Sequence, residues 1–153
     1  MRVEGKSDNL QFKNVVFEGV EKPTEGVDNA TIYCTATASK NNINFIDCEV
    51  NHGSIGIWKS GMSAACLDHK TIIQGTLFFG QTESGLVLIN EDAPVISNNV
   101  VSTILNEKGF KAISLDNVSN RVVVNRNILN TASGATGLAM NNCMAKATEP
   151  GQI

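Results

Sequence analysis

The sequence predicts an all-β fold of repeated, stacked coils, and three observations support this prediction. Asn occurs 18 times among the 153 residues, and Val and Ile together number 27, against 13 for Leu and Met. This mixture is typical of short strands joined by tight turns. The third observation is an eight-residue block that recurs five times without gaps. We therefore expect one β-solenoid domain over residues 1–153, with about five to six coils.

The repeated block has the pattern apolar-x-apolar-x-Asn-x-x-apolar and spans residues 10–17, 43–50, 71–78, 94–101 and 122–129. Its third position is always a large hydrophobic residue, which we call the anchor: Phe12, Phe45, Ile73, Ile96 and Val124. Two positions later comes a turn former in four blocks, Asn14, Asp47, Gly75 and Asn98, whereas Arg126 departs from the pattern. The eighth position is again apolar: Phe17, Val50, Phe78, Val101 and Leu129. The anchors lie 33, 28, 23 and 28 residues apart, which indicates a constant core block with loops of variable length.

Each block is interpreted as two short strands that meet at a sharp bend. The bend needs a residue that tolerates left-handed dihedral angles, hence Asn, Asp or Gly. A further strand usually follows, opened by Gly56, Gly85, Gly109 or Gly137. Stacking one coil on the next would align like residues, so that apolar columns fill the core and Asn side chains bond in ladders.

Two shorter segments complete the assignment. Residues 2–5 match the second strand of a coil whose first half is missing, so we expect a piece of a longer solenoid. Residues 61–70 are the one stretch that could form a short helical turn. An antiparallel sandwich or barrel would also contain short strands at turn-bounded spacing, but its strands would not repeat one another so closely.

The pattern resembles the right-handed parallel β-helix of the pectate-lyase-like superfamily, over about residues 2–142. That superfamily includes polysaccharide lyases, polygalacturonases, uronate epimerases and phage tailspike depolymerases. The resemblance implies a polysaccharide ligand, and it says little about which reaction this chain would perform.

One column predicts a covered outer surface. The residue just before the inward eighth position should point outward, yet it is apolar in four of the five blocks: Val16, Glu49, Leu77, Val100 and Ile128. A solvated strand face is normally polar. An apolar stripe indicates contact with another chain or segment. Tailspikes pack three such helices side by side, so the resemblance implies a homotrimer.

Composition excludes several function classes. The formal net charge of −3 argues against nucleic-acid binding. No apolar run approaches about 20 residues, so no membrane insertion is expected. None of the four cysteines has the spacing of a zinc or redox pair, and we expect free, mostly buried thiols. The chain carries no signal-peptide pattern, and the resemblance places the full-length protein in a virion or outside the cell.

Candidate catalytic residues follow from the loop ahead of each anchor. Five positions before the anchor, the column contains Lys40, Asp68, Glu91 and Ser119, and the next column contains Asn41, His69, Asp92 and Asn120. Adjacent coils lie about 4.7–4.9 Å apart. Asp68 and Glu91 are thus expected to face outward as neighbours, with His69 and Asp92 beside them. Paired carboxylates at such spacing suit glycoside hydrolysis, one as acid and one as base. The alternative is that all four are ordinary solvated turn residues.

Candidate substrate-binding residues are Trp58, Lys59, Lys111 and Arg126. Trp58 could stack on a sugar ring, with Lys59 directly after it, or could instead be a core anchor. Lyases and epimerases of the resembling superfamily use a basic residue together with calcium or another cationic group. No acidic cluster here has the spacing of a calcium loop, and two His residues are too few for a zinc site, so we expect no metal and no other cofactor.

These observations favour a carbohydrate-active protein that binds polysaccharide along its outer face, with or without cleavage by hydrolysis or elimination. The phage tailspike depolymerase is the most specific form of this hypothesis. The alternative is a non-catalytic solenoid, such as a stalk, an adhesin or a structural spacer of a surface or virion protein. The sequence leaves enzyme and binding protein as open alternatives.

Overall fold

The computed structural model describes residues 1–103, 109–144 and 150–153, and in it three parallel sheets wrap around a common interior. Sheet A has seven strands: β1 (Arg2–Val3), β4 (Ile32–Cys34), β7 (Ile55–Ser60), β8 (Asp68–His69), β11 (Ser84–Asp92), β14 (Lys111–Ser119) and β17 (Thr136–Asn141). Sheet B consists of β2 (Gln11–Lys13), β5 (Asn44–Ile46), β9 (Ile72–Gln74), β12 (Val95–Ser97) and β15 (Val123–Asn125). Sheet C consists of β3 (Val16–Glu18), β6 (Glu49–Asn51), β10 (Leu77–Phe79), β13 (Val100–Ser102) and β16 (Ile128–Asn130).

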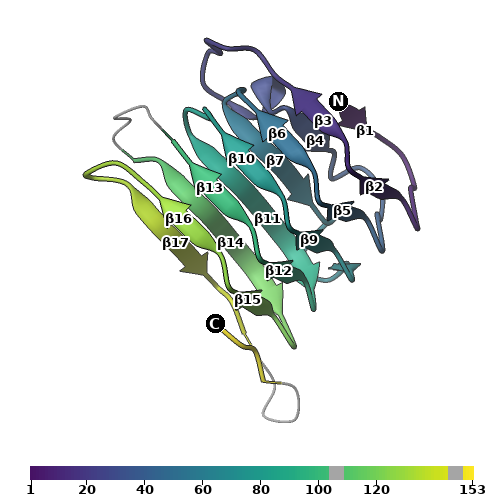
Figure 1. Ribbon diagram of the computed structural model, residues 1–153. Coiled ribbons are helices and arrows are strands. Elements are labelled where there is room, and N and C mark those ends of the chain that lie inside the picture. Colours follow the sequence, from purple (N-terminus) through teal and green to yellow (C-terminus); the bar gives the residue numbers. More distant parts are fainter. Residues whose placement is uncertain (104–108, 145–149) are drawn as a thin grey trace.

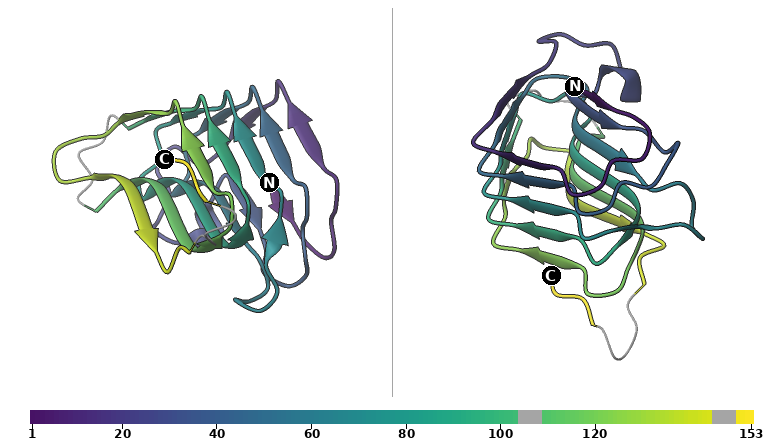
Figure 2. Two further views of the ribbon diagram at one scale, coloured as in Figure 1. Left: turned by 90° about the horizontal axis from the view of Figure 1, so that it is seen from below. Right: turned by 90° about the vertical axis from the view of Figure 1, so that its right-hand side faces the viewer.

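The chain visits the sheets in the order B, C, A, and it does so about five times. Every strand pair is parallel, so the molecule is a parallel β-helix and the antiparallel alternative is excluded (Figure 1). The two termini lie at opposite ends of the stack of coils (Figure 2). The expected second strand in residues 2–5 is confirmed as β1, which pairs with β4.

The anchors form one continuous ladder on sheet B. Phe12 pairs with Phe45, Phe45 with Ile73, Ile73 with Ile96, and Ile96 with Val124. Phe45, Ile73 and Ile96 are fully buried, and the rings of Phe12 and Phe45 stack with centroids 5.2 Å apart. The eighth positions form the matching ladder on sheet C: Phe17, Val50, Phe78, Val101 and Leu129. The two apolar columns meet in the interior and form the core.

The bend between sheets B and C has the same left-handed backbone in every coil. Its φ values are 56° at Asn14, 52° at Asp47, 63° at Gly75, 56° at Asn98 and 53° at Arg126. The positive φ predicted for Gly75 is thus confirmed. Arg126 adopts the same conformation although its side chain offers none of the usual advantages of Asn or Gly there. Backbone stacking therefore imposes the bend even where the local sequence does not favour it.

The Asn ladders are also present. In the position after the bend, the Asn99 side-chain amide donates to Oδ1 of Asn127 at 2.9 Å and to the carbonyl of Ile73. Asn117 donates to Asn90 at 2.7 Å in a second ladder on sheet A. These bonds satisfy polar groups that the coil stacking encloses.

Two local expectations were wrong. Residues 61–70 form no helical turn, because Asp68 and His69 continue sheet A as β8 and Ser63 bridges Cys66. The one helical segment in the described residues is the 3-10 turn η1 (Val27–Asn29). The strand expected to open at Gly109 begins instead at Lys111, as β14, and Ala112 lies opposite Gly85 because Ser84 pairs with Lys111. In the residues that the structure describes, no helix is long and apolar enough to cross a membrane.

Candidate functional site

One inward column of sheet A contains a single charged residue. Its members are Val3, Cys34, Lys59, Leu88, Leu115 and Met140. Lys59 is fully buried, and its Nζ donates to Oδ2 of Asp68 at 2.8 Å and to Oε1 of Glu91. Lys59 thus cannot bind an external ligand in this state, contrary to its assignment as a substrate-binding residue.

The sequence predicted that Asp68 and Glu91 lie side by side on adjacent coils. They do so, since β8 pairs with β11 at these two residues. The expectation that they face outward is wrong, because both side chains are fully buried. Oδ1 of Asp68 accepts a hydrogen bond from the backbone amide of Lys40 at 2.9 Å. Oε2 of Glu91 accepts one from Oγ1 of Thr71 at 2.7 Å. Buried carboxylates need such partners, and Lys59 supplies the opposite charge.

Burial raises the pKa of Glu91 above its ordinary value, although the charge and hydrogen bond of Lys59 and the hydroxyl of Thr71 act in the opposite direction. Glu91 therefore has a tendency to hold a proton inside the β-helix. A carboxyl group of this kind can take a proton from Nζ of Lys59, which it contacts, and release it again within the closed interior.

His69 and Asp92 lie next to this buried cluster and point the other way. Successive residues of a strand face opposite sides, so Asp92 turns outward where Glu91 turns inward. Nδ1 of His69 lies 3.0 Å from Oδ2 of Asp92, and half of the His69 side chain is exposed. Partial burial would raise the pKa of Asp92, but hydrogen bonds from Asn120, His69 and Ser119 outweigh it and lower that pKa.

The predicted alignment of the last coil is wrong by one residue. Ser119 pairs with Asp92, and it is Val118 that pairs with Glu91. The reason is an extra bend residue: Asn120 and Arg121 both have positive φ, where Ala93 alone makes the corresponding bend one coil earlier. The column of acidic residues therefore ends at Glu91, and the apolar Val118 takes the same place in the next coil.

A groove lies on the outer face of sheet A and contains two of the predicted binding residues, Trp58 and Lys111. Its volume is about 500 Å³. The floor is the outward row in which Trp58 pairs with Val87 and Val87 with Ser114. Trp58 is half-buried and its ring centroid lies 4.9 Å from that of Tyr33 in the preceding coil. Lys111 is exposed at the start of β14.

The groove also has polar residues that the sequence analysis missed, above all Glu25 and Glu83. Glu83 accepts a hydrogen bond from the backbone amide of Gly26, which ties the loop before η1 to the loop before β11. Oγ1 of Thr82, also in the lining, is buried without a hydrogen-bond partner among the described residues. These residues lie in loops of unequal length outside the repeat, so the repeat gave no signal for them.

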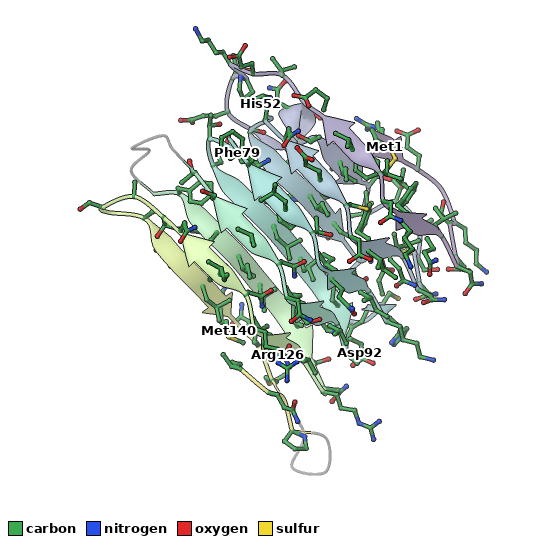
Figure 3. All side chains as sticks on the ribbon, in the orientation of Figure 1. Met1, His52, Phe79, Asp92, Arg126 and Met140 are labelled. Carbon is green, nitrogen blue, oxygen red and sulfur yellow. The ribbon has the colours of Figure 1, made fainter. Side chains whose placement is uncertain are left out.

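Arg126 lies away from this groove. It is exposed at the bend between β15 and β16, on the corner of sheets B and C. Figure 3 shows Arg126 and Asp92 at one end of the strands and His52 with Phe79 at the other. The structure thus brings Trp58 and Lys111 together, joins Lys59 to the buried carboxylates, and leaves Arg126 separate.

The predicted apolar stripe is present on the outer face of sheet C. Val16 pairs with Glu49, Glu49 with Leu77, Leu77 with Val100, and Val100 with Ile128. Val16, Leu77 and Ile128 are 62%, 36% and 57% exposed. The assignment of inward and outward positions is therefore confirmed, and what covers the stripe stays a prediction.

The four cysteines are free thiols, with Cys34 and Cys48 buried, Cys143 half-buried and Cys66 exposed. Burial raises the pKa of Cys34 to about 11, so this thiol is a poor nucleophile. Within the described part of the chain, no three His, Cys, Asp or Glu side chains are placed to hold a metal ion.

Comparison of the chain with protein-family models, with curated proteins and with solved structures found no match.

Proposed function

We propose that this β-helix binds a polysaccharide strand in the groove on the outer face of sheet A. The observation that carries the proposal is that Trp58 and Lys111, selected from sequence as sugar-binding residues, line one groove with two carboxylates. An aromatic face beside a few polar groups is the usual composition of a small-molecule site.

The aromatic part of the site is an extended platform. Trp58 and Tyr33 pair across adjacent coils, and the guanidinium of Arg2 lies 4.8 Å from the centre of the Tyr33 ring. Aromatic rings present an apolar face to the C–H groups of a sugar ring while leaving its hydroxyls free. Because the strands stack at about 4.8 Å, residues of successive coils can contact successive parts of an extended chain.

The polar part supplies hydrogen bonds for hydroxyl and carboxylate groups. Lys111 is a cation that can pair with a uronate or another acidic sugar, while Glu25 and Glu83 accept hydrogen bonds from hydroxyls.

The resemblance to the pectate-lyase-like superfamily supports a polysaccharide in particular. A tailspike-like arrangement would add self-association through the apolar stripe of sheet C into a trimer, with the full-length protein in a virion or outside the cell. Both are parts of the proposal, and they can be tested separately from sugar binding.

The test is calorimetric titration with a panel of neutral and acidic oligosaccharides. We expect binding of at least one acidic oligosaccharide, and its loss in Trp58→Ala. Phe79→Ala is the matched control, because Phe79 is an outward aromatic on sheet C, away from the groove. Absence of binding across the panel, or equal loss in both variants, would contradict the proposal.

Binding without cleavage has one specific observation in its favour. Asp68 and Glu91, the predicted acid and base, are enclosed in the interior and cannot reach a substrate. If the protein does cleave its ligand, Glu25 and Glu83 are the carboxylates placed to act. A reducing-end assay and an absorbance assay for unsaturated uronates would distinguish hydrolysis from elimination. Loss of turnover in Glu83→Gln with retained binding would assign the reaction to this groove.

A further inference from the structure

We propose that Lys59 and Asp68 form an intramolecular isopeptide bond inside the β-helix, with Glu91 as the catalytic residue that takes a proton from Nζ. This inference concerns the buried cluster and is independent of the proposed sugar binding. It adds a modification site in the interior between β7, β8 and β11.

The geometry is that of two reactants held together. Nζ of Lys59 lies 2.8 Å from Oδ2 of Asp68, and both side chains have zero exposed surface. The new bond would join Nζ to Cγ, the carbon that carries Oδ2, and effective molarities for well-oriented reactants held in contact reach about 10⁵–10⁸ M. Glu91 contacts the same Nζ, so a proton acceptor is already in place.

The balanced reaction needs no added reagent. Lys59 begins as an ammonium and Asp68 as a carboxylate. One proton passes from Nζ to Oδ2 along their hydrogen bond, which leaves a neutral amine and a neutral acid. The lone pair of Nζ then attacks Cγ of Asp68 and forms the C–N bond. Glu91 next takes a proton from Nζ, which it contacts, and gives it to Oδ2, which now shares its carbon with Nζ. The Cγ–Oδ2 bond breaks, water leaves, and Glu91 ends in the form in which it began.

The surroundings favour attack by Nζ on the carboxyl group of Asp68 and not on that of Glu91. The backbone amide of Lys40 donates to Oδ1 of Asp68, the atom on which negative charge develops during the attack. Glu91 has no such amide, and its Oε2 accepts from the hydroxyl of Thr71. The raised pKa of Glu91 suits a group that must accept and release a proton.

Other lysine and acid pairs lack this arrangement. The amine of Lys40, although buried nearby, donates to the carbonyls of Thr35 and Ala38. Lys6 and Asp8 form an ion pair at 3.8 Å, but the Lys6 side chain is 74% exposed. Desolvation is what makes a neutral amide preferable to two charges, because an ion pair in a low-dielectric interior pays a large solvation penalty. Within residues 1–103, 109–144 and 150–153, Lys59 is the one lysine that is buried in contact with two carboxylates.

The experiment is intact-mass spectrometry of the denatured, reduced chain, followed by cyanogen bromide cleavage. We expect a mass lower than that of the sequence by one water molecule. Met62 lies between Lys59 and Asp68 in the chain, so cleavage there cuts the backbone between them. With the isopeptide bond, the fragments on the two sides of Met62 stay joined on a denaturing gel. A wild-type chain of full mass whose two fragments separate would overturn the proposal without any variant.

Variants then assign the roles. Lys59→Arg and Glu91→Gln should have full mass and separate fragments, whereas Lys6→Arg, at an exposed lysine, should keep the loss of water. Circular dichroism establishes that each variant is folded. A folded Glu91→Gln chain that still loses water would overturn the role of Glu91. A loss of water that persists in Lys59→Arg would place the modification elsewhere and overturn the assignment.

Discussion

The interior of this β-helix has two contrasting regions. Between sheets B and C, each coil contributes an apolar anchor and an apolar partner, and the columns around Phe45, Ile73 and Phe78 are fully buried. At the far end of sheet A, the same interior encloses Lys59, Asp68 and Glu91 at zero exposure. The first region repeats from coil to coil, whereas the second occurs once, in the second and third coils.

The comparison shows how a repetitive fold accommodates an exception. In the repeated region every coil buries the same kind of surface, so each residue adds a similar hydrophobic contribution. In the ionic region stability depends on three side chains that must all be present. Buried charges are tolerable only as a set, because the loss of one member leaves another unpaired.

The largest effect is expected at the ionic region. Lys59→Met should lower the free energy of unfolding by about 3–5 kcal/mol, because it leaves the buried carboxylates of Asp68 and Glu91 with no lysine partner, whether that partner is an ammonium or the proposed amide nitrogen. Urea denaturation followed by circular dichroism measures this. The triple replacement of all three residues by apolar ones should recover much of the loss, and a mild effect of the single change would show that the charges do not act as a set.

In the repeated region, Ile73→Ala should cost about 2–5 kcal/mol, because the fully buried side chain leaves a cavity between its neighbours Phe45 and Ile96. Ile96→Ala should cost a similar amount, since it occupies the same column one coil later. The same denaturation experiment tests both. Strongly different values for the two would mean that the coils are not energetically equivalent.

The bend column tests whether backbone stacking dominates local preference. Gly75→Val should destabilise by more than about 1 kcal/mol, because φ is positive and a Cβ would lie 2.3 Å from Oδ1 of Asp47. Arg126→Asn, at the same bend two coils later, should instead stabilise by up to about 1 kcal/mol, since Asn tolerates that conformation better. Thermal unfolding of the two variants measures both changes in stability. Destabilisation by Arg126→Asn would contradict the inference that coil stacking holds Arg126 in an unfavourable backbone conformation.

Glu91 and Asp92, neighbours in β11, should make the stability depend on pH in opposite directions. The raised pKa of Glu91 means that its contribution is fully present below about pH 4.3 and is lost as pH rises through the folded pKa. The lowered pKa of Asp92 gives a contribution that is present above about pH 3.9 and is lost as pH falls through the folded pKa. Relative to wild type, Glu91→Gln should gain stability as pH rises, and Asp92→Asn should lose it. Unfolding measured across the acid and neutral pH range distinguishes the two variants. The same pH dependence of the free energy of unfolding in both would contradict the opposite pKa shifts of Glu91 and Asp92.

The smallest effect on folding is expected on the outer face of sheet C. Leu77→Lys combined with Val100→Lys should change the free energy of unfolding by only about 0.5 kcal/mol, as surface substitutions usually do. We expect sedimentation to show an oligomer for the wild type and a monomer for the double variant. Val101→Lys, on the inward side of the same strand, should unfold the chain. A monomeric wild type would contradict the role proposed for the stripe.

Much of the fold could be predicted because it repeats. The anchor column, the bend column and the outward stripe each have five members, so a single departure such as Arg126 in the bend column did not hide the pattern. The candidate site was predicted less well. Trp58 and Lys111, which the sequence suggested as substrate-binding residues, both line the groove, and their role stays a prediction. Glu25 and Glu83 lie in loops that occur once, and a one-residue insertion at Asn120 shifted the acidic column.

By itself, the sequence determined the all-β solenoid, the pairing of Asp68 with Glu91, and which side of sheet C is apolar, because periodic patterns specify strand, bend and face directly. Only the tertiary structure decided that Asp68 and Glu91 turn inward to Lys59, and that loops from different coils meet around Trp58. The physical reason is that a buried charge is tolerated only where partners from other coils converge on it, and that convergence depends on coil stacking and loop length, neither of which any local pattern encodes.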